Sequence, residues 1–476
     1  MTVRPTALTS CEQSNRDFAE TFIYQFILSQ EASLDTPGWQ EKACNGWTLR
    51  HSEKLDTAPL TDANGKPVGF LLGIAVDANG KSLHKGVKFR LAATDPGFID
   101  AVEETITGCA GRYLFAVLTP EFQSVYTDPV ADLGMVYDPT TRIVASSLML
   151  ALRDDILPNE VVPFDDIRSG AQFYTLGHTR DQRVKRMLAN FYLDLRTFTT
   201  ARFWPRPDTD LEVRQDTPVE TTDLIIERLR AVFCEILRTQ TCMVPLSGGR
   251  DSRCLIGVGS AEIHRARTLF TWRFHRQSGL DSETAKVIAR RLDLPHEEYL
   301  FQKLTMRSKQ TYLLRNGYAI YGTALRSLGI METLPEGHVL PRGNIMGILR
   351  ATNWTGQSEG PLNLTHAIRR LRLGEASGAA HSTTDRWTHE FMMWYQTLPE
   401  VGRSKVYDLL WTDIVLPHNQ GAREYGVPNN FIVNPYNDRR LLQLSMQLPL
   451  AFRRRDKAYD QIAERTVPHL SDIPYI

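Results

Sequence analysis

Residues 244–254 of this chain of 476 residues read VPLSGGRDSRC. The apolar run at residues 242–246 predicts a short buried strand, and the apolar run at residues 254–258 predicts a helix. The polar patch between the two runs, which begins at Ser247, is therefore expected on a strand-to-helix turn. This turn decides the fold class of the surrounding segment, and its residue types suggest what it binds.

The turn suits a polyphosphate ligand. A helix N-terminus presents unpaired backbone N–H groups and roughly half a positive charge, and both attract anions. Gly248 and Gly249 place no side chain in the approach, and the hydroxyls of Ser247 and Ser252 add donors. The carboxylate of Asp251 would repel phosphate unless Mg²⁺ lay between them. The turn therefore predicts a polyphosphate site with Mg²⁺ held by Asp251.

The segments around the turn alternate between helix and strand. Residues 220–239 have the apolar spacing of an amphipathic helix, residues 268–274 read as a strand and residues 281–292 as a helix. Val339 and Leu340 read as the end of another strand. This alternation predicts a parallel sheet covered by helices, preceded by a charged, proline-containing linker at residues 202–216.

The first 150 residues predict a strand-rich architecture. Apolar runs at residues 22–28, 69–76, 113–118 and 142–147 read as strands, and turn-forming clusters at residues 77–80 and 138–141 separate them.

One helix is expected among these strands, over residues 95–109. We expect Asp95 to cap it, Pro96 to occupy its first position and Gly108 to stop it.

Composition limits the function classes. Lys plus Arg and Asp plus Glu both number 55, so no global charge favours nucleic acid or an anionic membrane. The chain has no signal-peptide h-region and no uninterrupted apolar stretch of about 18 residues, which predicts a cytoplasmic protein with no membrane or nucleic-acid partner. The six scattered cysteines show no disulfide or zinc spacing and are expected to be buried thiols.

The order Ser-Gly-Gly-x-Asp-Ser resembles the pyrophosphate loop (PP-loop) of the N-type ATP pyrophosphatases, a family that includes asparagine synthetase. It is not the Walker pattern, which is absent from the chain. Weaker likenesses to asparagine synthetase lie on both sides of the loop: residues 126–134 with 143–147, residues 281–285 with Val287, Ile288, Leu292 and His296, residues 435–438, and Lys457 with Ile462 and Pro468.

This resemblance implies a two-domain α/β fold. Residues 1–205 would form a degenerate glutamine-amidotransferase-like domain, an α+β sandwich of the Ntn-hydrolase type. Residues 206–476 would form an α/β synthetase domain with the parallel sheet of the PP-loop pyrophosphatases.

The resemblance also implies ATP and Mg²⁺ as cofactors, with ATP split to AMP and pyrophosphate while a substrate carboxylate is adenylated. Asp251 would hold the metal. The implied nucleotide-binding residues are Leu246, Ser247, Gly248, Gly249, Arg250, Asp251, Ser252 and Gly343.

Two departures from asparagine synthetase matter. The chain begins Met1-Thr2-Val3 where those enzymes begin Met-Cys-Gly, so glutaminase activity is not expected. Residues 340–347 read LPRGNIMG where the family carries Ser-Gly-Glu-Gly-x-Asp-Glu; Gly343 is kept and the acidic residues are not. Three readings stay open: Asp251 holds Mg²⁺ with phosphate and water, another carboxylate substitutes, or ATP chemistry is lost.

Two cations are candidate catalytic residues. Arg342 would pair with phosphate in place of some metal charge, or it is an ordinary surface arginine. Lys457 corresponds to the family's C-terminal lysine and would stabilise charge in the acyl-transfer step; alternatively, residues 453–457 form a solvated charged face.

The expected function is an ATP-dependent amide-forming ligase without glutaminase activity, similar to β-lactam synthetases and lasso-peptide cyclases. Its substrate would be a small-molecule or peptide carboxylate, and a homodimer or a partner protein of a biosynthetic pathway is compatible with this reading. An asparagine synthetase-like enzyme using free ammonia, a non-catalytic scaffold and a tRNA-modifying adenylating enzyme are the alternatives. The aromatic residues Tyr318, Tyr321, Trp354 and Tyr436 line the substrate pocket or pack in the core.

Overall fold

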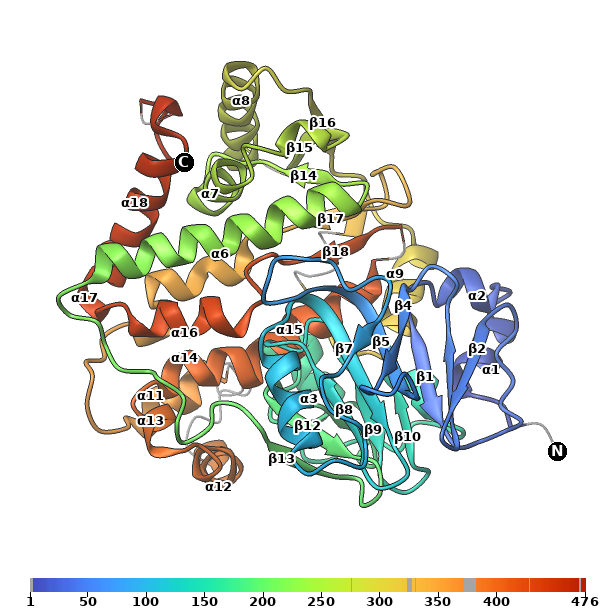
Figure 1. Ribbon diagram of the computed structural model, residues 1–476. Coiled ribbons are helices and arrows are strands. Elements are labelled where there is room, and N and C mark those ends of the chain that lie inside the picture. The colour runs from blue at the N-terminus through green and yellow to red at the C-terminus, as the bar shows by residue number, and fades with distance from the viewer. Residues whose placement is uncertain are drawn as a thin grey trace.

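The computed structural model describes residues 3–274, 276–322, 328–329, 331–371, 382–427, 429–470 and 472–476. The chain is a mixed α/β protein with antiparallel sheets in its N-terminal part and a small parallel sheet in its C-terminal part (Figure 1). No helix in the described ranges is long and apolar enough to cross a membrane.

Two antiparallel sheets occupy the chain up to residue 202. The six-stranded sheet has the order β11-β9-β10-β1-β3-β2, and its strands are β1 (Phe26–Ser29), β2 (Gln40–Cys44), β3 (Trp47–His51), β9 (Val136–Asp138), β10 (Ile143–Ala145) and β11 (Lys185–Arg186). The seven-stranded sheet has the order β13-β12-β8-β7-β5-β4-β6, and its strands are β4 (Thr57–Thr61), β5 (Pro67–Val76), β6 (Val87–Lys88), β7 (Ala110–Leu118), β8 (Gln123–Thr127), β12 (Phe191–Asp194) and β13 (Thr199–Arg202). Only the β4/β6 pair of the seven-stranded sheet is parallel.

These sheets share one hydrophobic core. Leu28 and Leu49 of the six-stranded sheet and Leu72 and Leu114 of the seven-stranded sheet are buried in the same cluster. The N-terminal part also contains four short helices, α1 (Thr6–Gln13), α2 (Phe18–Thr21), α4 (Leu148–Ala151) and α5 (Phe164–Asp166). The prediction of a strand-rich N-terminal part is therefore confirmed.

Aspartate side chains form turn hydrogen bonds at both positions where the sequence predicts a turn. Asp77 accepts hydrogen bonds from the N–H groups of Asn79 and Lys81, and Asp138 accepts one from Thr140 at the β9/β10 hairpin. The first predicted strand begins later than expected, at Phe26, because Tyr24 adopts a φ of 62° that interrupts extended backbone.

The inserted helix α3 (Phe98–Thr107) ends at Gly108, as predicted. Its cap was predicted wrongly, because the N-cap is Gly97 and not Asp95. The Asp95 carboxylate instead accepts from the N–H of Ala92 in the preceding loop. A short polar side chain can close a loop as readily as it caps a helix.

The C-terminal part begins with the long helix α6 (Pro218–Thr239) and contains the parallel strands. Strands β14 (Met243–Pro245), β15 (Thr268–Arg273) and β16 (His296–Leu300) form a three-stranded parallel sheet. Strands β17 (Val339–Pro341) and β18 (Phe431–Val433) form a parallel pair, and a parallel bridge from Cys242 to Val339 places that pair beside β14. The predicted alternation of strand and helix is confirmed.

Figure 1 shows α7 (Arg250–Val258) and α8 (Arg276–Arg291) beside the three-stranded parallel sheet, and the other helices of the C-terminal part extend away from it. Besides α6, they include α9 (Met306–Arg315), α11 (Leu364–Arg370), α12 (Ser382–Gln396), α13 (Glu400–Arg403), α14 (Val406–Leu410), α15 (Leu416–Arg423), α16 (Arg439–Gln447), α17 (Leu450–Arg454) and α18 (Lys457–Thr466). Residues 372–381, within the Gly- and Ser-rich segment at 354–388 that the sequence suggests is a mobile insertion, lie outside the described ranges.

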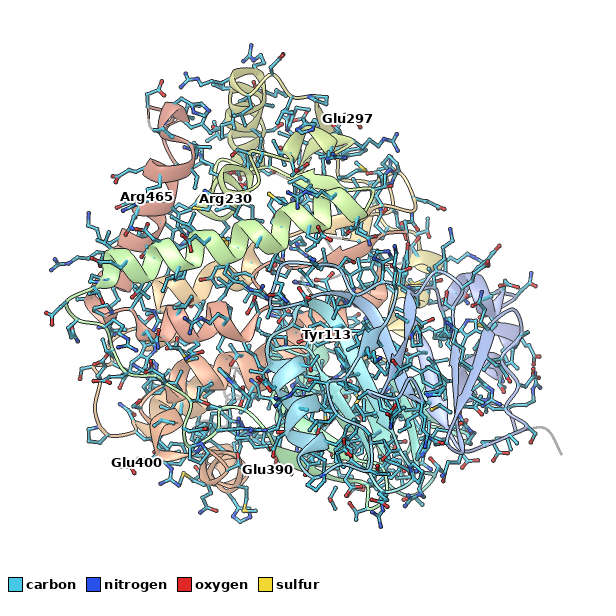
Figure 2. The ribbon with its side chains drawn as sticks, in the orientation of Figure 1. Tyr113, Arg230, Glu297, Glu390, Glu400 and Arg465 are labelled. Carbon is cyan, nitrogen blue, oxygen red and sulfur yellow. The ribbon has the colours of Figure 1, made fainter. Side chains whose placement is uncertain are left out.

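The predicted linker is a packed connection. Residues 203–217 form no helix or strand, but Phe203, Trp204 and Leu211 are buried. The two parts of the chain also meet through buried polar groups. Tyr113 of β7, labelled in Figure 2, is fully buried there, and Arg439 of α16 donates to its hydroxyl.

Candidate functional site

The predicted turn lies at the carboxyl end of β14. The N–H of Leu246 donates to the carbonyl of Phe270 at 2.8 Å, which extends the β14/β15 pairing by one residue. Residues 246–249 then reverse the chain, and α7 begins at Arg250. Ligands of open parallel sheets bind at this edge, outside the carboxyl ends of the strands.

Serine hydroxyls stabilise the conformation of the turn, residues 247–252. The N–H of Ser247 donates to the Ser252 hydroxyl at 3.1 Å, and the two hydroxyl oxygens lie 3.1 Å apart. The N–H of Gly249 donates to the Ser247 hydroxyl at 3.2 Å, and the N–H of Gly248 donates to the Asp281 carboxylate at 3.1 Å. The predicted residues Ser247 and Ser252 therefore meet, and Asp281 of α8 joins them.

Gly248 is required for space rather than for backbone conformation. A β-carbon on Gly248 would lie 2.6 Å from Cγ1 of Ile476 and 3.2 Å from the Asp281 carboxylate. A β-carbon on Gly249 would lie 3.2 Å from the Ser247 hydroxyl. The backbone of the turn is thus approached closely by neighbouring groups on one side.

Asp251 lies in the first turn of α7, where the structure gives it two partners. The Tyr459 hydroxyl donates to its carboxylate at 2.6 Å, and the Arg350 guanidinium lies 3.4 Å away. Burial raises the pKa of the Asp251 carboxyl above its ordinary value, while the Tyr459 hydrogen bond and the Arg350 charge oppose that rise. The cation that faces this carboxylate is Arg350.

Gly343 lies against Asp251, and its role in nucleotide binding stays a prediction. A β-carbon on Gly343 would lie 3.1 Å from the β-carbon of Asp251. Arg342 points elsewhere: its guanidinium pairs with Glu424 at 3.3 Å, over the ring of Trp272. Burial lowers the pKa of Arg342, and the charge of Glu424 opposes that shift. Its pairing with phosphate stays a prediction.

A chain of ion pairs connects the first turns of α7 and α18. Arg250 pairs with Asp460 at 2.8 Å and with Asp456 at 3.6 Å, and Arg350 also reaches Asp456 at 3.6 Å. Lys457 lies in this α18 turn, where its amine is 3.6 Å from Asp460. Its side chain is 57% exposed, so it is free to reorient toward a ligand at the loop.

A cavity of about 250 Å³ opens beside the turn. Its apolar wall includes Phe270 and Trp272 of β15, and its polar wall includes the hydroxyls of Ser247, Ser252 and Thr271. The cavity therefore combines an apolar wall of two aromatic rings with hydroxyl donors and the N-terminus of α7.

The described residues fit ATP better than they fit a protein-built metal centre. Within the described ranges, no three His, Cys, Asp or Glu side chains are placed to hold an ion. Ile345 and Met346, where asparagine synthetases carry acidic residues, are fully buried. Asp251 is the single carboxylate in the first turn of α7, and Mg²⁺ often uses one carboxylate together with substrate phosphates.

Sequence reasoning missed several residues at the site. Arg350 and Tyr459 reach Asp251 from segments about 100 and 200 residues away, so no local spacing in the sequence predicts these contacts. The segment from Ile473 onward was also missed. The Arg253 guanidinium donates to the carbonyls of Gly248, Ile473 and Pro474, and this contact lays that segment against the turn.

The remaining candidates fall outside this site. Trp354 and Tyr436 are buried and hydrogen-bonded to Asp408 and Ser445, which supports the core-packing alternative for these two residues. Tyr318 and Tyr321 pack edge-on against Phe164.

All six cysteines are buried and free, as predicted. Burial raises the pKa of the Cys242 thiol to about 12, which disfavours a reactive thiolate. Met1 and Thr2 lie outside the described residues.

Comparison of the chain with protein-family models and with curated protein sequences finds no match.

Proposed function

We propose that this protein is an ATP-dependent amide-forming ligase that adenylates a substrate carboxylate, releases pyrophosphate and passes the acyl group to an amine. One observation carries the proposal: the Ser-Gly-Gly-x-Asp-Ser turn lies at the carboxyl end of a parallel strand, at a helix N-terminus, beside a cavity of about 250 Å³. The resemblance to the PP-loop family supplies the reaction.

In this proposal each part of the site has a role. The apolar wall at Phe270 and Trp272 binds the base, and Ser247 and Ser252 donate to the phosphates. The α7 N-terminus and Arg350 stabilise the negative charge that develops as pyrophosphate leaves, since fixed cations and dipoles act most strongly where charge develops. Lys457 stabilises the acyl-transfer step from the first turn of α18.

Mg²⁺ would reach the site bound to the phosphates, with Asp251 as its protein ligand. It would neutralise phosphate charge there. The Tyr459 hydroxyl orients the Asp251 carboxylate, and Arg350 balances its charge when no nucleotide is present.

The proposed function includes a division of the chain into two domains of known type. The two antiparallel sheets with a common core support a degenerate glutaminase-like domain over residues 1–205. The parallel strands and the loop support a synthetase domain over residues 206–476. In this proposal the amine is free ammonia, as in the asparagine synthetase-like alternative, or part of the substrate.

The test is the product of ATP cleavage. Wild-type protein with ATP and Mg²⁺ is incubated with fractions of cell-extract metabolites and with candidate peptides, and AMP and pyrophosphate are measured. We expect at least one fraction to give AMP and pyrophosphate in equal amounts, and Asp251→Asn to lower the rate about 100-fold, or about 2.7 kcal/mol of transition-state stabilisation. Release of ADP and phosphate would contradict the proposal.

A non-catalytic scaffold is the second candidate. It is favoured by apolar Ile345 and Met346 at the family's acidic positions and by Asp251 already paired with Arg350. Nucleotide binding without cleavage in any fraction would support it over the ligase.

A further inference from the structure

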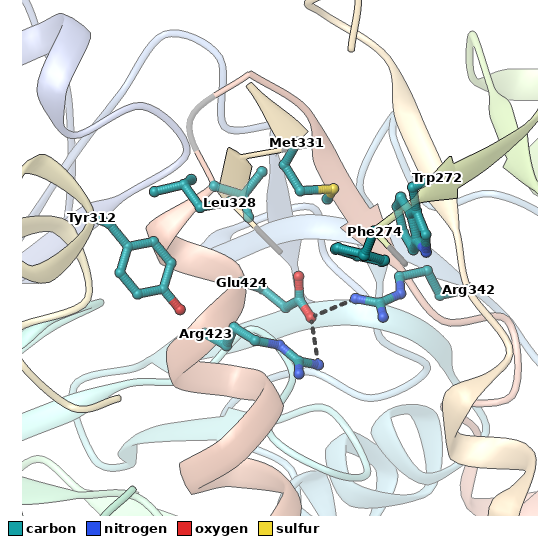
Figure 3. A pocket seen from close by; sticks show the side chains of 9 residues that line it. Trp272, Phe274, Tyr312, Leu328, Met331, Arg342, Arg423 and Glu424 are labelled. Carbon is teal, nitrogen blue, oxygen red and sulfur yellow. Dashed lines mark hydrogen bonds and ion pairs between the residues drawn. The ribbon is translucent and has the colours of Figure 1, made fainter. Parts of the chain in front are cut away.

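A second cavity adjoins the first. It has a volume of about 110 Å³ and lies at the carboxyl ends of β15 and β17. Figure 3 shows its walls, formed by Trp272, Phe274, Tyr312, Leu328, Met331, Arg342, Arg423, Glu424 and Val427. Trp272 and Phe274 line both cavities, so a molecule here would lie next to a nucleotide bound at the turn.

The centre of this cavity carries three charges. One carboxylate oxygen of Glu424, Oε1, accepts from Arg342 at 3.3 Å and from Arg423 at 3.4 Å. The Glu424 side chain is 2% exposed, and the two arginine side chains are 22% exposed. Among the residues that line the cavity, two guanidiniums face one carboxylate, which leaves one excess positive charge for a ligand anion to balance. The buried Asp132, outside the lining, also acts on Arg342.

The second oxygen of Glu424, Oε2, is buried and has no hydrogen-bond partner among the residues that the structure describes. A buried carboxylate oxygen without a donor is costly, so an N–H or O–H group of a ligand would be stabilised at this atom. Figure 3 shows the Glu424 carboxylate among the residues that line the cavity. The cavity is therefore complementary to a ligand that carries both an anionic group and a hydrogen-bond donor.

Apart from the buried hydroxyl of Tyr312, the rest of the lining is mostly apolar, and its position limits how a ligand can lie in the cavity. Arg342 lies over the ring of Trp272, on the side shared with the nucleotide cavity. Leu328, Met331 and Val427 are buried apolar walls. The volume is somewhat below the roughly 150 Å³ of a cavity that holds benzene, which suits an aliphatic group of moderate size.

We propose that this cavity binds the carboxylate substrate as an α-amino acid with an aliphatic side chain. Arg342 and Arg423 hold the carboxylate at the junction of the two cavities, the ammonium group donates to Oε2 of Glu424, and the side chain lies against Leu328, Met331 and Val427. The proposal rests on the proposed function for its reaction.

In that reaction a carboxylate oxygen bonds to the α-phosphorus of ATP as the bond to the bridging oxygen breaks. Pyrophosphate departs with the bonding electron pair, and an acyl-adenylate remains.

Binding is tested without turnover by saturation-transfer NMR on the full chain, with and without α,β-methylene-ATP, which cannot release pyrophosphate. The probes are leucine, methionine, glutamate, leucinamide and 4-methylpentanoate. We expect leucine and methionine to bind, and removal of either the carboxylate charge (leucinamide) or the amine (4-methylpentanoate) to weaken binding at least about tenfold. Equal binding of leucine and 4-methylpentanoate, or preference for glutamate, would overturn the proposal.

Variants localise the binding. Arg342→Met and Arg423→Met are each expected to weaken leucine binding about tenfold or more, and Arg403→Met, at an exposed arginine of α13, is expected to leave it unchanged. Val427→Phe fills the cavity while keeping all three charges, and it should abolish binding. Thermal unfolding checks that each variant is folded; leucine binding that survives both Arg342→Met and Val427→Phe in folded protein would refute the site.

The two proposals fail in different ways. Binding of α,β-methylene-ATP without binding of any amino acid refutes the amino-acid site and leaves the nucleotide site standing. Leucine binding that depends on Arg342, in a protein that binds no nucleotide, supports the cavity assignment and refutes the ligase.

Discussion

Gly248 shows at the scale of one residue why the turn tolerates so little change. Its missing β-carbon leaves room for Ile476 and for Asp281, whose carboxylate accepts from the Gly248 N–H. A nucleotide phosphate that binds at this N–H would have to replace the Asp281 carboxylate. The turn therefore needs both a small residue and a movable neighbour.

Gly248→Ala is predicted to weaken nucleotide binding about tenfold, or ~1.4 kcal/mol, because the new methyl group displaces Ile476 and Asp281. Isothermal titration with α,β-methylene-ATP measures this change. Gly347→Ala is the matched control, since its β-carbon would meet only the Trp411 ring, at 3.5 Å. Equal affinities for the two variants would contradict the role of the turn.

The residues of the turn could be predicted from sequence because they are consecutive. Ser247, Gly248 and Ser252 meet within one strand-to-helix connection, so their order alone specifies their contacts. Arg350 and Tyr459 could not be predicted, because the approach of distant segments decides their contacts with Asp251. The position of Arg342 in a motif allows either a phosphate partner or an ordinary surface arginine, and neither reading identifies Glu424, its partner in the structure.

Helix α18 contributes to the site through its first turn. Asp456, Lys457, Tyr459 and Asp460 all lie at this end, and three of them contact residues at the start of α7. The remaining one, Lys457, holds only Asp460 in the described structure.

Lys457→Met is predicted to lower the turnover rate at least about tenfold while leaving the melting temperature nearly unchanged. A functional cation that is 57% exposed contributes little to stability. Arg465→Met is the control on the same helix, because Arg465 pairs with Asp223 and is also half-exposed (Figure 2). Equal rates for both variants would place Lys457 on a solvated face.

Helix α15 contains a histidine whose protonation opposes folding. Burial, followed by the charge of Arg186, lowers the pKa of His418 to about 3. Nδ1 of His418 donates to the carbonyl of Ile414 at 2.7 Å, and Nε2 accepts from Gly177 at 3.1 Å, which fixes the neutral ring.

As pH falls below about 6.5, the unfolded chain binds a proton at His418 and the folded chain does not until about pH 3. The free energy of unfolding should therefore fall across this range by about 1.4 kcal/mol per pH unit for this group. His418→Gln should remove that contribution. Urea unfolding between pH 7 and pH 5 measures it, and parallel pH profiles for the two proteins would refute it.

Element prediction succeeded where apolar periodicity was continuous. The bounds of the predicted helix at 220–239 and of the predicted strand at 268–274 differ by at most two residues from those of α6 and β15. It failed at ends set by single polar or strained residues, as at Asp95 and Tyr24. Such ends depend on which hydrogen bond a loop prefers, and spacing does not encode that choice.

In the molecule as a whole, a buried ion pair of the C-terminal part lies where the two parts of the chain meet. Arg228 of α6 bonds Asp438 at 2.5 Å and also donates to the carbonyls of Asp77, Ala78 and Gly108 in the N-terminal part. Asp438 is fully buried and also caps α16. These contacts fix the position of the N-terminal part relative to α6 and α16.

Arg228→Met is predicted to cost about 3–5 kcal/mol of unfolding free energy, because it leaves Asp438 buried without its counterion. Chemical denaturation measures this loss. Arg230→Met, two residues along α6 and exposed (Figure 2), should change stability by less than about 0.5 kcal/mol. Equal stabilities would show that the junction does not depend on this pair.

The measurement that tests the central claim most directly is titration of the full chain with α,β-methylene-ATP and Mg²⁺, because it needs no knowledge of the substrate. We predict one saturable site whose affinity falls at least about tenfold in Ser252→Ala and stays unchanged in Ser404→Ala, at an exposed serine whose hydroxyl donates only to the Val401 carbonyl. Absence of binding to the wild-type protein, or equal binding by both variants, would contradict the assignment of the 247–252 turn as a nucleotide site.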